Sequence, residues 1–546
     1  MKHCKTKFSG IVFVAFFILL ASCNEKKEVQ VENNQNSKPN VILIYADDLG
    51  RGMLGTYGQK IVKTPNIDRI ANQGMRFDNA YGCMYCAPAR ASLLTGMHDA
   101  RRDQFNISNA GIWMELDQRL TMDEITDIIH KVIKPAEEGE VFLGQVAQMA
   151  GYKTAQFGKL EWGFATTPQR MERHGWDYHF GFYDHKRCHG FYPPFLFENG
   201  QKIDIPGNTH INCAKTPQAE SPENLTIRRN MEGKEVYSED IIMDKMMTFL
   251  DANNPKETNK PFFIYFPSQL PHGPVSVPEV HDDFKNNPNL TELEKEYATM
   301  VKILDLDVGR IHKKLEELGI LDNTIIVFTG DNGHEVYTLE EGRTATDFDV
   351  KSGEAYDDVK TKFYSETGND IFDGNDGMAG LKRSNWEGGT RVPLFWYWKG
   401  NIKKGQVSNQ MVSNYDFLNT LAEIVGLPQR TEKDGISYAK SLFGGQSEVR
   451  GYTPTSSKLG PALVTKDGWK LRYYIKKDIF QLYYLPEDYK EENDLSEKYP
   501  EKLETLKAIL FKECGNDWEN GYGPIKESYS RYKAPKLKDI ENKQIL

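Results

Sequence analysis

Continuous apolar runs along the chain predict the buried strands of a sheet. These runs lie at residues 41–45, 262–266 and 325–328. A uniformly apolar strand is typical of the centre of a parallel or mixed sheet, where both faces are buried. Between the runs, apolar residues recur at helical spacing, at residues 66–74, 141–150 and 293–318. Strands that alternate with helices predict a layered α/β domain.

The pattern changes near Gly435. Short aromatic segments separated by turns follow, at residues 464–465, 469–474 and 480–484. They predict a small antiparallel sheet, and the helical pattern of residues 500–514 predicts a helix packed on it. We therefore expect a large α/β domain at residues 39–434 and an α+β subdomain at residues 435–546.

The first residues have the pattern of an export signal. Three lysines precede an apolar run at residues 11–20, which is too short for a comfortable membrane span and predicts a signal peptide at residues 1–22. The run ends in Leu-Ala-Ser-Cys, which resembles the bacterial lipobox and implies lipidation of Cys23. The polar residues 23–38 then predict a flexible tether. We expect an exported protein, lipid-anchored at the periplasmic or outer-membrane surface; the alternative is an uncleaved amphiphilic anchor.

Composition narrows the classes of partner. The 546 residues are 39% hydrophobic and 12% aromatic, as in ordinary globular proteins. A formal net charge of −10 argues against a nucleic-acid partner, but it allows an anionic substrate if cations gather in one pocket. Once Cys4 and Cys23 are set aside, an odd number of the seven cysteines remains, so a cysteine with a role other than bridging is worth seeking. The sequence does not indicate an oligomeric state.

Acidic pairs follow two of the predicted strands. Asp47 and Asp48 come after the first strand, and Asp331 and Asn332 come after the strand at 325–328. Ligands of open α/β sheets collect beyond the carboxyl ends of the strands. Adjacent carboxylates are costly to bury unless a cation neutralises them, and oxygen ligands favour calcium or magnesium. The alternative is two acidic turns without a metal.

Residues 86–96, Cys-Ala-Pro-Ala-Arg-Ala-Ser-Leu-Leu-Thr-Gly, carry the most specific motif. They resemble the signature of the formylglycine-dependent sulfatases, Cys-x-Pro-x-Arg followed by Thr-Gly. The resemblance implies that a maturation enzyme oxidises Cys86 to formylglycine (3-oxoalanine). One hydroxyl of the hydrated aldehyde would attack sulfur, and the second would then expel sulfate. The rival interpretation, a redox pair of Cys83 and Cys86, does not account for the Pro-x-Arg continuation.

The resemblance covers roughly residues 38 to 500. The further matching segments are residues 64–69, 74–77, 158–159, 271–274, 330–333, 381–382, 386–393, 469–471 and 482–485. Because their order and spacing agree, the chain is identified as a member of this family. Membership implies an alkaline phosphatase-like fold: a large mixed, mostly parallel sheet between helices, followed by a small antiparallel sheet with a helix. The larger domain would be the catalytic one.

The resemblance also implies a role for each matching residue. A calcium ion, with magnesium as the second choice, would be held by Asp47, Asp48, modified Cys86, Asp331 and Asn332. Arg90 would hold the nucleophile in place. Lys159 and Lys382 would bind the sulfate and neutralise charge on its oxygens, and His272 would be a general acid or a hydrogen-bond donor to the bridging oxygen.

One position departs from the family pattern. Many members have a histidine two residues after the first active-site lysine, where this chain has Glu161. The segment 184–193 resembles a loop that supplies a histidine in some relatives, so His189 is the candidate replacement; the alternative is that it only lines the pocket. Arg187 and His334 are candidate sugar contacts, although each is more often a packing residue.

These features predict a sulfuric ester hydrolase that acts on a sulfated carbohydrate, a polysaccharide or its oligosaccharides. Two alternatives stay open. One is a phosphodiesterase or phosphonate hydrolase of the same superfamily, and the other is a lipoprotein that binds sulfated glycans without catalysis.

Overall fold

The computed structural model describes Met1 and residues 38–104, 112–132, 139–159, 165–217, 219–338 and 361–522. The chain divides into two compact units, Met1–Asn36 and Ser37–Leu546, and all elements below belong to the second. Cys23, the predicted signal and tether, and Glu161 lie outside the described residues. None of the described helices combines the length and apolar character needed to cross a membrane.

The second unit is built on a ten-stranded mixed sheet. The strand order is β11-β2-β10-β9-β1-β8-β4-β5-β6-β7. Its five central strands run parallel: β9 (Thr324–Gly330), β1 (Asn40–Ala46), β8 (Phe262–Pro267), β4 (Lys153–Gly158) and β5 (Tyr178–Gly181). The flanking strands are β2 (Met75–Phe77), β6 (Phe195–Glu198), β7 (Gln201–Asp204), β10 (Leu394–Tyr397) and β11 (Gln406–Ser408). The predicted mixed, mostly parallel sheet is confirmed.

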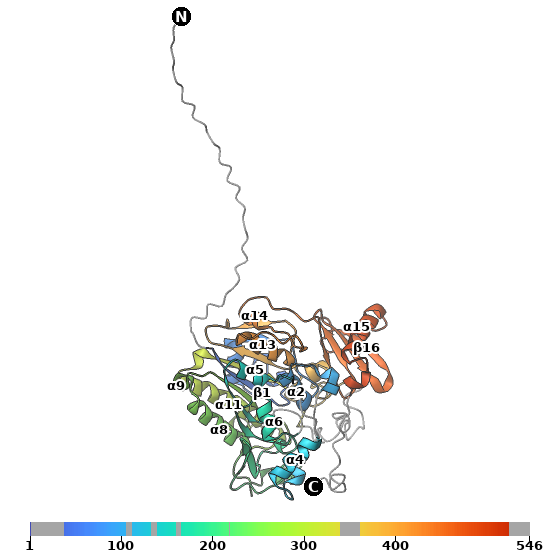
Figure 1. The fold of residues 1–546 in the computed structure, drawn as a ribbon. Coiled ribbons are helices and arrows are strands. Elements are labelled where there is room, and N and C mark those ends of the chain that lie inside the picture. The colour runs from blue at the N-terminus through green and yellow to red at the C-terminus, as the bar shows by residue number, and fades with distance from the viewer. Residues whose placement is uncertain are drawn as a thin grey trace. The chain divides into compact units, whose positions relative to one another are not determined.

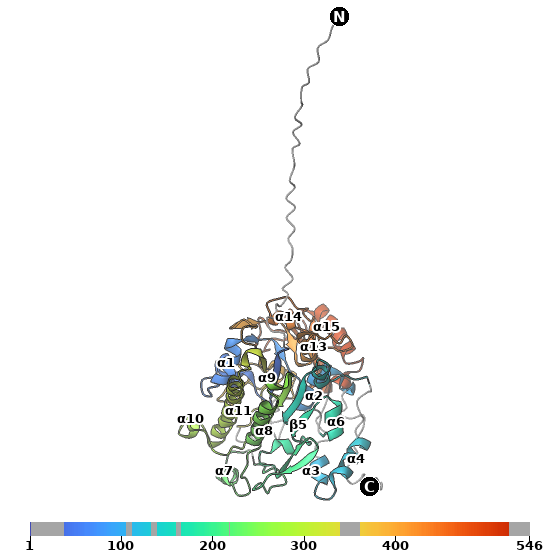
Figure 2. The same ribbon diagram turned by 60° about the vertical axis from the view of Figure 1, so that its left-hand side comes forward.

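Helices cover both faces of this sheet (Figures 1 and 2). On one face Ile42 and Ile44 pack into a core with α1 (Pro65–Gln73), α8 (Ser238–Ala252) and α11 (Glu292–Glu317). On the other face Val41, Leu43 and Tyr45 pack with α2 (Cys86–Thr95), α5 (Leu143–Met149) and α13 (Phe417–Ile424). Alternate residues of β1 thus enter two separate cores, and this is why the strand is apolar throughout.

Shorter elements connect these layers. The further helices are α3 (Ile112–Leu116), α4 (Met122–Val132), α6 (Pro168–Arg173), α7 (Pro222–Arg229), α9 (Pro255–Thr258), α10 (Asp282–Lys285), α12 (Glu387–Thr390) and α14 (Ala439–Leu442). β3 (Ala80–Tyr81) and β12 (Val412–Ser413) form a two-stranded sheet.

The C-terminal part forms its own antiparallel sheet. Its strands are β13 (Tyr452–Thr455), β14 (Ala462–Thr465), β15 (Trp469–Tyr474) and β16 (Ile479–Tyr484). Helix α15 (Pro500–Glu513) packs on it through Leu506 and Leu510, which meet Leu471 and Leu482 (Figure 1). The predicted small sheet with a helix is confirmed, whereas the exact boundary at residues 434 and 435 stays a prediction.

The register of the central strands brings the predicted site residues together. Ala46 pairs with Gly330 at the carboxyl ends of β1 and β9, so the residues that follow lie side by side. Lys159 follows β4, and its backbone N–H donates to the Pro267 carbonyl at the end of β8 (2.7 Å). The site therefore lies at the carboxyl ends of four neighbouring strands, β9, β1, β8 and β4.

Candidate active site

Three carboxylates and an amide gather at the ends of β1 and β9. Asp47, Asp48, Asp331 and Asn332 are all fully buried. The Asp48 backbone N–H donates to Asp331 Oδ1 (3.0 Å), and Asn332 Nδ2 donates to Asp48 Oδ1 (2.8 Å). Asp48 has a positive φ of 62°, a conformation that costs a non-glycine residue energy and that is found mostly where the surrounding structure enforces it.

Two oxygens of this group have no hydrogen-bond partner among the described residues. Asp47 Oδ1 and Asn332 Oδ1 are buried, and neither accepts a hydrogen bond from the described residues. Burial, followed by the charge of Asp47, raises the pKa of Asp331 well above its usual range. A hard divalent cation would satisfy the oxygens and relieve this repulsion. The residues therefore fit a calcium or magnesium ion.

The donor atoms are arranged unequally around this position. Ligand atoms of Asp47, Asp48, Cys86 and His272 lie within 4.8 Å of one another. Asp331 is not part of this group of four. Its Oδ1 accepts hydrogen bonds from the backbone N–H groups of Asp48 and Asn332 (2.9 Å for the latter). Its Oδ2 lies 3.5 Å from the guanidinium nitrogen Nη2 of Arg90.

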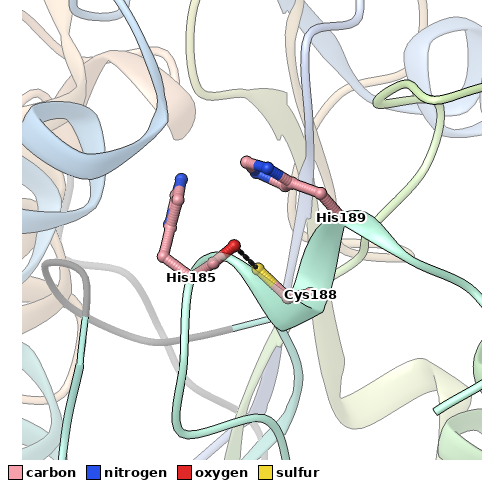
Figure 3. Close-up of side chains that lie close together, drawn as sticks. All are labelled: His185, Cys188 and His189. Carbon is pink, nitrogen blue, oxygen red and sulfur yellow. Dashed lines mark hydrogen bonds between the residues drawn. The ribbon is translucent and has the colours of Figure 1, made fainter. Parts of the chain in front are cut away.

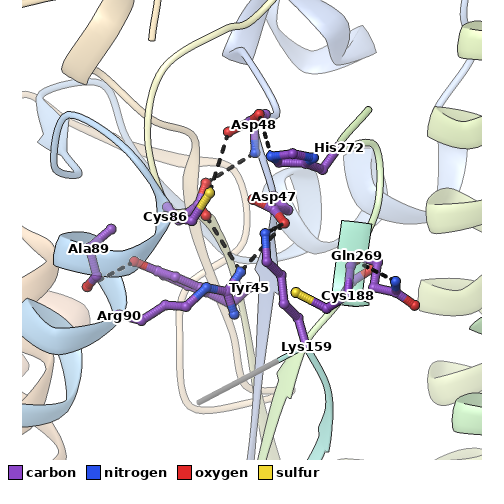
Figure 4. A network of polar contacts seen from close by, with 12 residues as sticks. Tyr45, Asp47, Asp48, Cys86, Ala89, Arg90, Lys159, Cys188, Gln269 and His272 are labelled. Carbon is purple, nitrogen blue, oxygen red and sulfur yellow. Dashed lines mark hydrogen bonds and ion pairs between the residues drawn. The ribbon is translucent and has the colours of Figure 1, made fainter. Parts of the chain in front are cut away.

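Cys86 opens helix α2 and faces the carboxylates (Figure 4). It is 1% exposed, and its Sγ lies 4.0 Å from Asp48 Oδ1. Burial, followed by Asp47, raises the pKa of the Cys86 thiol well above its usual value. A protonated thiol is a poor nucleophile. Unmodified Cys86 is thus ill suited to attack an ester in this protein environment.

One helical turn further on, Arg90 lies beneath the carboxylates. It is fully buried, its Nη2 lies 3.8 Å from Asp47 Oδ2, and its guanidinium lies 5.6 Å from the centre of the Tyr45 ring. Figure 4 shows it between helix α2 and the end of β1. The turn spacing of Cys-x-Pro-x-Arg places both side chains on one face of the helix.

Two buried lysines reach the same carboxylates. Lys159 is 0% exposed and pairs with Asp47 Oδ2, whereas Lys382 is 2% exposed and donates to Asp48 Oδ2 (2.6 Å). Lys382 Nζ also lies 3.5 Å from Cys86 Sγ. An anion bound against Cys86 therefore meets at least one ammonium group directly, in a site with little water to screen the charge.

Two histidines stack above the lysines. The rings of His189 and His272 lie 4.0 Å apart and 13° from parallel. His272 Nδ1 donates to the Gly273 carbonyl, which leaves Nε2 to accept from Lys382 Nζ (3.2 Å). Burial, followed by Lys382, lowers the pKa of His272 to about 3, so the imidazole is neutral without an anionic ligand.

His189 also meets a lysine, and it belongs to a second cluster. Its Nε2 accepts from Lys159 Nζ (3.2 Å). Figure 3 shows the rings of His185 and His189 on the same side of one turn, with their centres 4.7 Å apart. Cys188 Sγ points back and donates to the His185 carbonyl (3.0 Å). His189, the candidate for the histidine missing at position 161, thus lies beside Lys159.

Comparisons with known proteins agree with this geometry. Residues 39–427 match the family model described as "Sulfatase". The chain belongs to the sulfatase family. Residues 379–514 also match the model "N-sulphoglucosamine sulphohydrolase, C-terminal". The predicted family membership and the predicted enzyme class, a sulfuric ester hydrolase, are confirmed.

Named relatives span most of this sulfatase. The N-acetylgalactosamine-6-O-sulfatase of Bacteroides thetaiotaomicron is 27% identical over 90% of this chain and 96% of its own. The human N-acetylgalactosamine-6-sulfatase is 29% identical over 75% of this chain and 66% of its own length. Among solved structures, that of Ps i-CgsB in complex with k-i-k-neocarrahexaose has a TM-score of 0.64 at 23% identity and covers 90% of this chain and 96% of that one.

Two predicted sugar contacts of the sulfatase lie apart from the cluster. The buried Arg187 pairs with Asp117 and lies over the Phe195 ring, with its guanidinium 4.3 Å from the ring centre. The buried His334 has its Nε2 3.3 Å from Asp370 Oδ2. Arg187 is held in an ion pair and His334 contacts a carboxylate, and the structure does not bring either side chain to Cys86.

Sequence reasoning missed two polar groups that hold the site. Tyr337 donates through its hydroxyl to Asp48 Oδ2. Gln269 joins the two histidine turns: its Nε2 donates to the carbonyls of Cys188 (2.6 Å) and Gly190 (3.1 Å), and its Oε1 accepts from Ser238 Oγ (2.6 Å). No motif signalled either residue, because their partners are remote in sequence.

We expect Gln269→Leu to lower kcat by roughly 10²-fold while the fold persists, because the His189 and His272 rings would lose their common tether and shift. Steady-state kinetics on an aryl sulfate, with thermal unfolding as the check on folding, measures this. Asn419→Leu is the matched control and should keep kcat, since Asn419 is a buried amide that also donates to two carbonyls, those of Arg430 (3.1 Å) and Gly435 (2.6 Å), neither of which belongs to the site. Unchanged kcat in Gln269→Leu would show that the tether is dispensable.

A buried ion network ties the C-terminal sheet to the loop of Lys382. Lys470 of β15 lies 2.8 Å from Glu387 Oε1 and 2.9 Å from Glu491 Oε1. Glu387 begins α12 and also pairs with Arg391 (2.6 Å). All four side chains are buried or nearly so. The small sheet thus contributes a cation that lies between the carboxylates of Glu387 and Glu491.

We expect Lys470→Met to destabilise the sulfatase by about 3–5 kcal/mol, because it leaves the carboxylates of Glu387 and Glu491 without their shared cation. Chemical denaturation measures the change. Lys476→Met, in a turn of the same sheet, is the control and should stay within about 0.5 kcal/mol of the parent. Equal stability of the two variants would contradict this account of the network.

Proposed function

We propose that this sulfatase removes sulfate from a sulfated carbohydrate, with formylglycine at position 86 as the nucleophile and a bound calcium ion. The observation that carries the proposal is the pair of oxygens without a described partner, Asp47 Oδ1 and Asn332 Oδ1, beside the buried Cys86, whose Sγ lies 4.0 Å from Asp48 Oδ1. The relatives named for N-acetylgalactosamine-6-sulfate hydrolysis support a carbohydrate as the substrate.

The two steps divide between the two hydroxyls of the hydrated aldehyde. One hydroxyl loses its proton and its oxygen bonds to sulfur, while the bond from sulfur to the sugar oxygen breaks and the sugar oxygen takes up a proton. The second hydroxyl then loses its proton and re-forms the aldehyde, and the bond from its carbon to the sulfate oxygen breaks. The cation supplies charge that stabilises the sulfate oxygens and the deprotonated hydrate.

The surrounding side chains would serve these steps without moving far. Lys159 and Lys382 exchange part of their pairing with Asp47 and Asp48 for the sulfate oxygens, and Arg90 holds the nucleophile. An anionic substrate adds negative charge next to His272 and favours its protonated form. The proton on Nε2 is then available to the leaving sugar oxygen.

Maturation and export complete the proposal. Because Cys86 is 1% exposed, a formylglycine-generating enzyme must reach it before the chain folds. The lipobox-like segment supports an exported protein that is lipid-anchored through Cys23 at the periplasmic or outer-membrane surface, where environmental polysaccharides are met.

Sulfate release from a panel of defined sulfated oligosaccharides tests the proposal, with enzyme produced alongside a maturation partner. We expect release from at least one carbohydrate and only slow turnover of phosphate diesters. Turnover of phosphate diesters in preference to every sulfate ester would instead support the phosphodiesterase alternative. Tight binding without release, in protein that carries the aldehyde, would support a non-catalytic role.

A further inference from the structure

A cationic cavity opens beside helix α7 (Pro222–Arg229; Figure 2), separate from the cluster around Cys86. Its volume is about 730 Å³, enough for a sugar residue and its hydration. Three basic side chains, Lys215, Arg229 and Lys234, line it together with one acidic side chain, Glu232. The cavity therefore favours an anionic ligand.

Fewer of the cationic side chains in this cavity are paired with carboxylates than in a second cavity nearby. A second cavity of about 430 Å³ shares Arg229 and is also lined by Lys285 and Lys295. There each cation has a carboxylate: Arg229 pairs with Glu292, Lys285 with Glu279 (2.5 Å) and Lys295 with Glu292 (2.8 Å). The smaller cavity thus offers no free positive charge to a ligand.

Lys215 and Lys234, in the larger cavity, make hydrogen bonds to backbone carbonyls instead of ion pairs with carboxylates. Lys215 Nζ donates to the Lys186 carbonyl, and Lys234 Nζ donates to the carbonyls of Ile227 (3.3 Å) and Arg228 (3.4 Å). Within the described part of the chain, neither ammonium group pairs with a carboxylate. Lys215 is partly buried and Lys234 is buried, so an ion pair with a bound anion would be stronger there than at an open surface.

The wall of the cavity joins the turns that carry the active-site histidines. Lys215 contacts the carbonyl of Lys186, which immediately precedes the turn Arg187–His189. The next residue, Thr216, donates through Oγ1 to the carbonyl of Val275 (2.9 Å), just beyond His272. After burial, His272, Lys159 and His185, the charge of Lys215 also contributes to the lowered pKa of His189. The wall of the cavity therefore contacts the segments that flank His189 and His272.

We propose that this cavity binds a second anionic group, a carboxylate or sulfate, on the sugar next to the one that carries the scissile sulfate. The inference rests on the proposed carbohydrate function and makes it narrower: the substrate is a polyanionic oligosaccharide rather than a singly sulfated sugar. Lys215 is the specificity-determining residue, because it lies between the cavity and the His189 turn.

Three disaccharides with the same scissile sulfate test this inference, and they differ only in the neighbouring sugar. In the first this sugar is a uronate, in the second it is the methyl ester of that uronate, and in the third it is a neutral sugar that carries a sulfate. We expect the sulfatase to prefer whichever anionic neighbour fits over the methyl ester by roughly 10-fold in kcat/KM, the value of one charge-assisted hydrogen bond. Lys215→Met should abolish this preference. Lys285→Met, in the neutralised cavity, should keep it.

The ratio of rates on two substrates cancels the concentration of folded enzyme, so a poorly folded variant does not obscure the result. Calorimetric binding of the same disaccharides to Cys86→Ala gives the comparison without turnover. An unchanged preference in Lys215→Met, or no preference in the parent, would overturn the inference and leave the proposed function intact. If the enzyme hydrolysed an aryl sulfate but released sulfate from no carbohydrate, the proposed function would be overturned instead. Binding of the disaccharides to Cys86→Ala would still show whether the cavity binds the second anionic group.

Discussion

Removing the divalent cation from the matured sulfatase should reduce sulfate release by about 10³-fold, and adding calcium should restore it. A Lewis acid at a transferred group contributes several kcal/mol to the transition state, and each ~1.4 kcal/mol is a tenfold change in rate. Asp47 Oδ1 and Asn332 Oδ1 have no other described partner, so no described group takes the place of the ion at these two oxygens. Activity after chelation, with the metal content measured on the same sample, tests this.

The same treatment should lower thermal stability, because Asp47, Asp48 and Asp331 would repel one another in a buried site. Asp331→Asn is a second variant for this test. It removes one of the three negative charges but keeps an oxygen that accepts the backbone N–H groups of Asp48 and Asn332. Asp244→Asn, at a 72% exposed side chain, is the control. Metal-free enzyme with its full rate would contradict the metal site.

Cys86→Ala should lower kcat by at least ~10⁴-fold, the usual scale for loss of a covalent nucleophile. In the proposed mechanism the side chain at this position supplies the atom that bonds to sulfur. Single-turnover measurement of aryl sulfate hydrolysis gives the rate, and thermal unfolding shows whether the variant folds. The small Ala side chain should fit at the start of α2.

Cys83→Ala is the matched control for this variant. Cys83 is also buried, and Asn414 Nδ2 donates to its Sγ (3.6 Å), but it does not reach the carboxylates. It should keep most of the activity. If instead Cys83→Ala and Cys86→Ala lost activity equally, a redox pair would explain both, and the formylglycine interpretation would fail.

The strand ends were predictable because their information is local. The apolar run of β1 and the apolar core of β9 identify central strands, and parallel strands in register bring Asp47 and Asp331 to one edge. The Cys-x-Pro-x-Arg spacing likewise sets Cys86 and Arg90 one helical turn apart. Each element is decided by residues a few positions apart, whereas the pairing of β1 with β9 joins segments that are remote in sequence.

Other features depend on contacts that no local pattern encodes. Strand β10 runs antiparallel between β9 and β2, and its four apolar residues do not reveal this direction. Gln269 and Tyr337 acquire their roles only when remote turns meet. His334 was a candidate sugar contact, yet its side chain is buried and its Nε2 lies 3.3 Å from Asp370 Oδ2.

The most direct test is the mass of the peptide that contains residue 86, measured on active enzyme fractions. We expect the mass of an aldehyde in place of a thiol, and specific activity that rises in proportion to the aldehyde-bearing fraction across preparations made with and without the maturation partner. Full activity in protein whose Cys86 is entirely the unmodified thiol would contradict the account.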